Sequence, residues 1–296
     1  MQARNTFSIS GELRSIVDFR KREKIMSLTV QNVHVYLEDR GSDDPILFLH
    51  GFPDSAEMWS GIIQILEDQY RCLAPDLPGL GRSVAPTNFA YSLEGMASFI
   101  DAMVEAIHPT LPINLVCTDF GATFGLAWAI THPERVRRIA TIGGVTLSSD
   151  YRWHRNARLL RMPLVGELGM ATMTRASFIK SMVASAPLLS PEHFENVYDL
   201  SLKQPSVRRM ALRLYRSISH KDFVGWEDRL RTLTSRVPTL VLWGDKDPFI
   251  APAYAERFGD ARVEHFAENG HWLAIEEPEE VAQRLRAFFA AEVRAI

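Results

Sequence analysis

Cysteine is scarce in this chain, and long apolar runs are missing. Only two cysteines, Cys72 and Cys117, occur among 296 residues, and each lies in an apolar, strand-like run. We expect both to be buried and reduced, which argues against a disulfide framework and a zinc site. No apolar run approaches the ~20 residues that span a bilayer, so stable membrane insertion is not expected. The net charge of −3 gives no general reason to expect a nucleic-acid partner.

The first 25 residues lack the features of a secretory signal. They contain no continuous apolar core and no small-residue cleavage site. Basic residues cluster near their end, at Arg20, Lys21, Arg22 and Lys24. Such a cluster is typical of a membrane-touching arm or of a solvated extension, and we prefer the second interpretation. We therefore predict an N-terminal extension over residues 1–25 and a cytoplasmic location.

Short apolar runs alternate with helical patterns along much of the chain. After a β-like stretch that begins near residue 27, strands are predicted at 45–49, 71–76, 113–117, 136–142, 238–243 and 262–266. Helices are predicted at about 56–68, 93–108, 121–133 and 278–292. This alternation predicts an α/β fold, with a mostly parallel central sheet flanked by helices.

The strand signals stop after the sixth predicted strand. Residues 148–232 show only helical patterns, which prolines interrupt. We predict that this segment is a helical cap, inserted after the sixth strand into one α/β domain made of residues 26–147 and 233–296. Ligands of open α/β sheets bind at the carboxyl edge of the strands, and the insert is well placed to cover that edge.

The sequence LVCTDFGA, from Leu115 to Ala122, has the pattern of a sharp strand-to-helix turn with a reactive residue at its apex. The small residues Cys117 and Gly121 flank Asp119, as so tight a turn requires. The N–H of the next residue and the start of the helix would then face developing negative charge. On this segment alone, a surface aspartate that caps a helix is an alternative explanation.

Two further polar segments each follow a predicted strand. WGDKDP places Asp245 and Asp247 after one strand, and ENGHW places His271 after the next. Either segment alone is consistent with a turn or an exposed loop. Together with Asp119 they follow the order nucleophile, acid, histidine, which is the chain order of the triad in hydrolases built on an α/β sheet. We therefore predict that the three segments form one catalytic site.

From about residue 27 to its end, the chain resembles the α/β-hydrolase superfamily. It is most similar to the branch of epoxide hydrolases and haloalkane dehalogenases, whose loops are matched here by HGFP, DLPGLGRS and WGDKDPFI. The resemblance implies that Asp247 is the triad acid, with Asp245 a weaker candidate, and that His271 is the base. It also implies that the backbone N–H groups of Phe52 and Phe120 form the oxyanion hole.

A carboxylate nucleophile at Asp119 suits one kind of reaction. Attack on a carbonyl carbon would give an anhydride, whereas displacement at an sp³ carbon gives an alkyl ester on the enzyme. Water activated by His271 and Asp247 would then hydrolyse this ester, with no metal and no cofactor. The expected substrate is a small strained ether or alkyl halide. Methionines in the cap favour an apolar one, at Met162, Met170, Met173 and Met182.

The leaving group distinguishes two activities. Haloalkane dehalogenases generally place a tryptophan directly after the nucleophile, and fluoroacetate dehalogenases place an arginine there; this chain has Phe120, whose side chain cannot donate. In epoxide hydrolases cap tyrosines protonate the opening ring. Tyr215, in LRLYRS, lies in a segment that resembles one of theirs, although packing of an aromatic ring is an equal alternative. We therefore favour an epoxide hydrolase that forms diols.

The partner of that tyrosine is not evident, because LLRMPLVGEL in the first half of the cap contains none. His154 is a candidate donor, and Tyr151, Tyr198 and His193 remain open as substitutes. Trp153 offers an N–H to a halide, so a haloalkane dehalogenase is the alternative. A catalytically weak hydrolase fold that binds a ligand is a further alternative, and a homodimer is left open.

Overall fold

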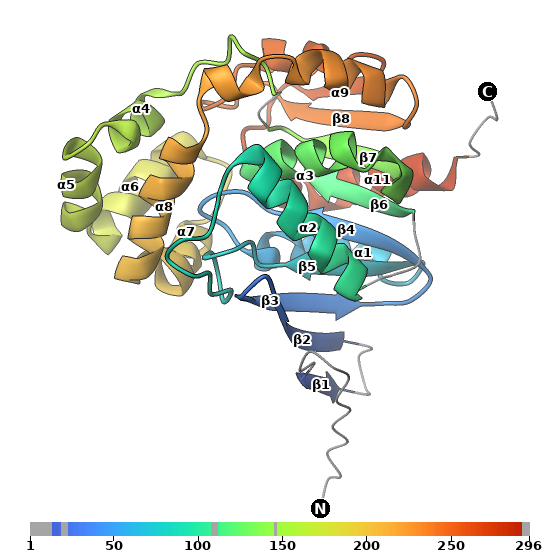
Figure 1. The fold of residues 1–296 in the computed structure, drawn as a ribbon, viewed down its shortest axis with the longest axis horizontal. Helices are drawn as coiled ribbons and strands as arrows, with labels where there is room; N and C mark the ends of the chain where they lie inside the picture. The colour runs from blue at the N-terminus through green and yellow to red at the C-terminus, as the bar shows by residue number, and fades with distance from the viewer. Residues whose placement is uncertain (1–13, 19–22, 108–111, 145–146, 292–296) are drawn as a thin grey trace, which may run out of the picture.

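The computed structural model describes residues 14–18, 23–107, 112–144 and 147–291. In these ranges nine strands form one sheet in the order β1-β2-β3-β5-β4-β6-β7-β8-β9 (Figure 1). The strands are β1 Arg14–Asp18, β2 Glu23–Val30, β3 Val33–Arg40, β4 Asp44–Leu49, β5 Tyr70–Pro75, β6 Ile113–Cys117, β7 Val136–Ile142, β8 Thr239–Gly244 and β9 Arg262–Phe266. Strands β1, β2, β3 and β5 pair antiparallel, whereas every pair from β5–β4 to β8–β9 is parallel. The sheet is mainly parallel, as predicted.

The central strands are apolar on both faces because helices cover both. Every residue of β6 and β8 is buried, which explains their mostly apolar sequences INLVC and TLVLWG. One face is covered by α1 Ser60–Leu66, α10 Leu273–Glu276 and α11 Pro278–Ala290. The other face is covered by α2 Leu93–Ile107, α3 Asp119–Thr131 and α9 Trp226–Thr234, of which α2 and α3 lie in front of the sheet in Figure 1.

The predicted cap is a separate group of helices beside the sheet, on the left in Figure 1. It consists of α4 Arg155–Arg161, α5 Val165–Thr172, α6 Arg175–Ser185, α7 Pro191–Val197 and α8 Pro205–Ser217, with a π-helical turn at Tyr198–Leu202. Helix α9 falls at the end of the predicted cap, but it packs against α3 over the sheet. The limits of 148 and 232 for a cap domain remain a prediction.

The sheet begins earlier than the sequence indicated. Strand β1 and the first residues of β2 fall within residues 1–25, which were expected to be an extension. The cap therefore follows the seventh strand of the structure, β7, because β1 precedes the six strands that were predicted. Most of the basic cluster lies outside the described residues, at 19–22. No described helix combines the length and apolar character needed to cross a bilayer.

The packing expected of individual residues agrees with the structure. Cys72 and Cys117 are both buried and free. The side chains of Trp59, Trp128 and Trp243 are fully buried between helices and sheet. These residues contribute to the core, and the remaining tryptophans of the chain are Trp153, Trp226 and Trp272.

Candidate active site

Asp119 lies at the apex of the turn between β6 and α3. Its φ of 47° is in the left-handed region, a strained conformation for a residue with a side chain. The turn brings Gly121 against β4, where a Cβ atom would lie 2.2 Å from the carbonyl oxygen of Leu49. A side chain at residue 121 would therefore push the turn apart. The predicted elbow is present, and it directs the Asp119 carboxylate into a cavity.

The two carboxylate oxygens of Asp119 have different surroundings. Oδ1 accepts a hydrogen bond of 2.9 Å from the backbone N–H of Phe52, and the N–H of Phe120 also interacts with the carboxylate. Oδ2 lies 3.7 Å from Nε2 of His271. Burial raises the pKa of Asp119, and the charge of His271 and the two N–H groups oppose this rise. The N–H of Phe52 thus holds Oδ1, while Oδ2 faces the imidazole of His271.

Asp247 orients His271. Its Oδ2 lies 2.7 Å from Nδ1 of the imidazole, while its Oδ1 accepts the backbone N–H groups of Phe249 and Ile250 at 2.7 and 3.0 Å. Burial favours the neutral imidazole, but the charge and hydrogen bond of Asp247, and then the charge of Asp119, outweigh burial and raise the pKa of His271 to about 9. His271 is therefore an imidazolium at neutral pH, and it lies between the carboxyl groups of Asp247 and Asp119.

Asp245, the weaker candidate for the acid, does not reach this group. Its Oδ1 lies 2.5 Å from Nδ1 of His265, on the neighbouring strand β9, and Glu256 contacts the other ring nitrogen. This pairing raises the pKa of His265. Asp247, and not Asp245, is the carboxylate next to His271.

A cavity of about 600 Å³ lies between this group and the cap. Its walls are mostly apolar and aromatic, and they include Phe120, Tyr215, Trp272, Met170 and Met182. Within the lining, Asp119 and His271 are the residues that form charged pairs. The volume is in the range of pockets that enclose a small organic molecule. No group of three or more His, Cys, Asp or Glu in the described ranges is arranged to hold a metal ion.

Two tyrosines line the cavity beside Asp119. The ring of Tyr215 contacts Phe120 and Phe52 edge-on, at centroid distances of 5.2 and 5.4 Å. Burial and then the charge of Asp119 raise the pKa of both Tyr151 and Tyr215. Neither hydroxyl forms a hydrogen bond with another described residue, and both side chains border the cavity. Two protonated phenols therefore remain available to a ligand near Asp119.

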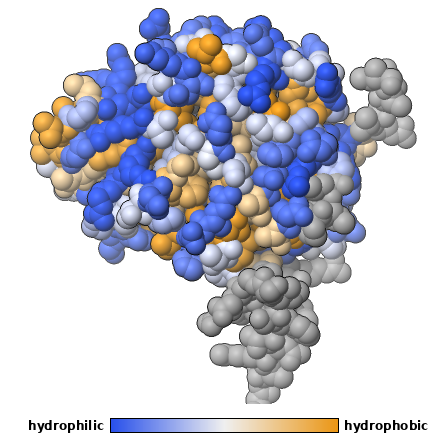
Figure 2. Space-filling view, viewed as in Figure 1, coloured by the Kyte–Doolittle hydropathy of each residue, from blue (hydrophilic) through white to orange (hydrophobic). Residues whose placement is uncertain are grey.

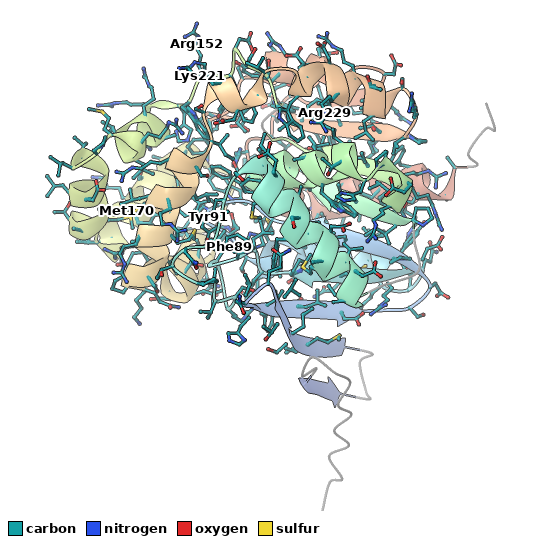
Figure 3. The ribbon with its side chains drawn as sticks, viewed as in Figure 1. Phe89, Tyr91, Arg152, Met170, Lys221 and Arg229 are labelled. Carbon is teal, nitrogen blue, oxygen red and sulfur yellow. The ribbon has the colours of Figure 1, made fainter. Side chains whose placement is uncertain are left out.

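The position of Tyr215 is fixed by the core loop that precedes α2. Two residues before it, Arg213 donates to the carbonyl of Phe89, and two residues after it, Ser217 donates to the carbonyl of Tyr91 at 2.9 Å. Figure 3 shows Phe89 and Tyr91 close to α8. The cap helix that carries Tyr215 is thus anchored to the core on both sides of this residue.

The other candidate donors divide into two groups. Trp153 and His154 line the cavity, and the Trp153 ring lies 6.0 Å from that of Phe120. Burial, followed by the nearby charge of His271, lowers the pKa of His154 to about 4, so its imidazole is neutral. Tyr198 and His193 do not line this cavity: the Tyr198 hydroxyl accepts from Arg208, and His193 pairs with Asp54 at 3.0 Å. The structure therefore adds Tyr151 to the site, which the sequence had left among several possibilities.

Residues 44–278 match the family model of the alpha/beta hydrolase fold, and the chain belongs to this family of enzymes. It is 37% identical to a haloalkane dehalogenase of Agrobacterium fabrum over 143 residues, which is 46% of each chain, so the match spans about half of that relative. It is 24% identical over 268 residues to a cis-3-alkyl-4-alkyloxetan-2-one decarboxylase of Shewanella oneidensis, over 84% of this chain and 83% of that one.

Solved structures are similar over most of the chain. The haloalkane dehalogenase DbeA-M1 loop variant of Bradyrhizobium elkanii gives a TM-score of 0.74 at 22% identity, over 89% of this chain and 95% of that one. Cfl2 of Burkholderia cenocepacia gives a TM-score of 0.76 at 23% identity, over 93% and 99%. At these identities the likeness establishes the fold alone, and the substrate must be argued from the site.

Proposed function

We propose that this hydrolase opens small apolar epoxides to diols through an alkyl ester on Asp119. The observation that carries the proposal is the pair of phenols, Tyr151 and Tyr215, to which no described residue hydrogen-bonds, beside a buried carboxylate in an apolar cavity. A serine nucleophile would serve ester hydrolysis, but the elbow has none at its apex. An opening epoxide ring needs both a carboxylate that attacks carbon and an acid that protonates oxygen.

In the first step, Oδ2 of Asp119 attacks a ring carbon and the bond from that carbon to the ring oxygen breaks. The oxygen takes a proton from Tyr215 or Tyr151, which leaves a hydroxyalkyl ester and a tyrosinate. Oδ1 stays hydrogen-bonded to the N–H of Phe52, which keeps Oδ2 directed at the substrate.

In the second step, water attacks Cγ of Asp119 and gives its proton to His271. The oxyanion forms where the N–H groups of Phe52 and Phe120 already converge. Alkylation has by then removed the negative charge that faced Nε2, so the pKa of His271 falls, its proton passes through solvent to the tyrosinate, and the neutral imidazole can act as the base. The ester C–O bond breaks as the hydroxyl proton of the tetrahedral intermediate moves to the leaving oxygen; the diol leaves, and His271 keeps the proton from water and is again the imidazolium of the resting site.

Dehalogenation is the second candidate, and Trp153 favours it. Its indole borders the cavity next to Phe120, and no described residue accepts a hydrogen bond from it. A relative and a solved neighbour are haloalkane dehalogenases by name. Against this candidate, the side chains of Phe52 and Phe120 offer a halide no N–H, so Trp153 would have to stabilise it alone.

Matched substrates separate the two activities. The enzyme is incubated with a terminal epoxide and with the primary bromide of the same carbon skeleton, and diol and free bromide are measured. We expect diol and little bromide.

A single turnover in ¹⁸O-water should label the peptide that contains Asp119 and leave the diol unlabelled, because its new oxygen comes from Oδ2. Asp119→Asn should abolish turnover, whereas Asp245→Asn is the matched control that should retain it. Bromide release without diol would instead support the dehalogenase, and label in a first-turnover diol would exclude the ester.

A further inference from the structure

The tip of the cap carries an exposed apolar patch. We call its five residues the cap-edge patch: Leu159 (43% exposed), Met162 (49%), Leu164 (82%), Val165 (41%) and Leu168 (65%). They come from α4, α5 and the turn between them, and Figure 2 shows an apolar area at the left end of the molecule, where α5 lies in Figure 1. Adjacent exposed apolar side chains of this size mark a surface that contacts something else.

Leu164 has no evident role in the folded chain itself. It is the most exposed large apolar residue of the patch, and its φ of 65° is in the left-handed region, where a leucine is strained. Glycine or asparagine would adopt this backbone at lower cost. The fold therefore gains neither packing nor a relaxed turn from leucine at this position.

Cations border the cap-edge patch on the same face of α4. Arg155, Arg158, Leu159 and Met162 follow one another at helical spacing, so they form a single exposed stripe. Within the described ranges, neither arginine forms an ion pair or a side-chain hydrogen bond. The carboxylate on α5, Glu167, is already paired with Arg216. The apolar surface is thus flanked by uncompensated positive charge.

The cap-edge patch is continuous with the mouth of the cavity. Leu159 and Val165 are exposed members of the patch, and both also line the cavity that contains Asp119. An apolar molecule that leaves the patch would therefore meet these two apolar side chains as it enters the cavity.

We propose that the cap-edge patch docks on the surface of an anionic lipid bilayer, from which apolar substrate enters the cavity. An exposed apolar helix edge with arginines beside it is the arrangement that lies in the interface of such a bilayer. A second copy of the chain fits less well, because a twofold contact through the patch would bring the arginines of both copies together. The proposal goes beyond the chemistry of Asp119 and does not depend on it.

The test is flotation of the full-length protein with vesicles in the absence of substrate. One set contains equal parts of phosphatidylglycerol and phosphatidylcholine, and the other contains phosphatidylcholine alone. We expect the wild type and the inactive Asp119→Asn variant to float equally with the anionic vesicles and much less with the neutral ones. Arg155→Gln with Arg158→Gln should weaken binding about 30-fold, from ~1 kcal/mol for each basic residue near an anionic surface. Arg209→Gln with Arg236→Gln is the matched control, since both arginines are exposed and lie outside the patch.

The apolar part of the patch is tested separately. Leu164→Asn with Leu168→Gln should reduce flotation about tenfold or more, because two leucine side chains leave the interface. Leu164→Asn alone should also maintain or raise the thermal unfolding midpoint, which separates lost docking from unfolding. Val224→Gln removes an exposed apolar residue elsewhere and should have no effect on flotation.

Three results would overturn the proposal. The first is that the wild type does not float, and the second is that it floats equally with both kinds of vesicle. The third is that the leucine substitutions leave flotation unchanged but convert a dimer to a monomer in light scattering, which would assign the patch to a second copy. Because no substrate is present, none of these results bears on the proposed function.

Discussion

Replacing Asp119 by asparagine should change the proton affinity of His271. In the native chain Nε2 of His271 lies 3.7 Å from Oδ2 of Asp119, and Nδ1 lies 2.7 Å from Oδ2 of Asp247. The two carboxylates together hold the pKa of His271 at about 9, despite its burial. Asp119→Asn removes one of these charges and keeps the shape of the side chain. It therefore imitates the loss of charge that alkylation of Asp119 would cause.

The structure gives the expected size of this effect. Two unit charges about 4 Å apart interact by ~4 kcal/mol at an effective dielectric constant of 20. One pH unit corresponds to about 1.4 kcal/mol, so the midpoint of His271 should fall by up to about 3 pH units. A fall from about 9 toward neutrality would make His271 a base only after the ester has formed, which is when the mechanism requires one.

Nuclear magnetic resonance of the ¹⁵N-labelled imidazoles measures this midpoint directly, and His271→Gln assigns the signal. Asp245→Asn is the matched control: it should lower the midpoint of His265, which Asp245 contacts at 2.5 Å, and leave that of His271 unchanged. Equal midpoints for His271 in the wild type and in Asp119→Asn would refute the charge coupling. So would a wild-type midpoint at the ordinary value for histidine.

Four further substitutions have defined outcomes. Tyr215→Phe and Tyr151→Phe should each lower kcat for an epoxide about 100-fold. Their unfolding midpoints should not change, because neither hydroxyl bonds to another described residue; a lowered midpoint with normal kcat would show a packing role. Asp247→Asn should lower kcat by ~10⁴ and allow the ester on Asp119 to accumulate in rapid-quench mass spectrometry, because His271 loses its orientation; unchanged steady-state turnover would contradict this. Gly121→Ala should reduce the free energy of unfolding in urea by about 3 kcal/mol or more, because its Cβ would lie 2.2 Å from a backbone oxygen; a change within experimental error would show that the elbow can relax.

The central strands of the fold were predictable because they are buried on both faces. The predicted strands at 113–117 and 136–142 have the observed bounds of β6 and β7. The prediction at 262–266 also matches the bounds of β9, although this edge strand has no fully buried residue. Strand β1 could not be recognised in this way, since it pairs at the edge of the sheet and lies among charged residues. The position of α9 was equally hidden, because its sequence shows a helix but not which layer it joins.

Within the site, the residues on core strands were easier to predict than those of the cap. Asp119 and His271 follow strands that meet at one sheet edge, so their chain order already indicated that they converge. The choice between Asp245 and Asp247 rested on resemblance, and only the directions of the two side chains separate them. Tyr151 could not be distinguished from Tyr198 by sequence, because the packing of the cap helices decides which hydroxyl borders the cavity.

The most direct test of the account is the intact mass of His271→Gln after incubation with an epoxide. Without the base the ester should persist, so the protein should gain the whole mass of the epoxide. Digestion should place the addition on the peptide that contains Asp119, and the Asp119→Asn, His271→Gln double variant should show none. An addition that lacks the oxygen of the epoxide, or an addition on another peptide, would contradict nucleophilic attack by Asp119. So would the absence of any addition to folded His271→Gln, if the wild-type enzyme turns over the same epoxide.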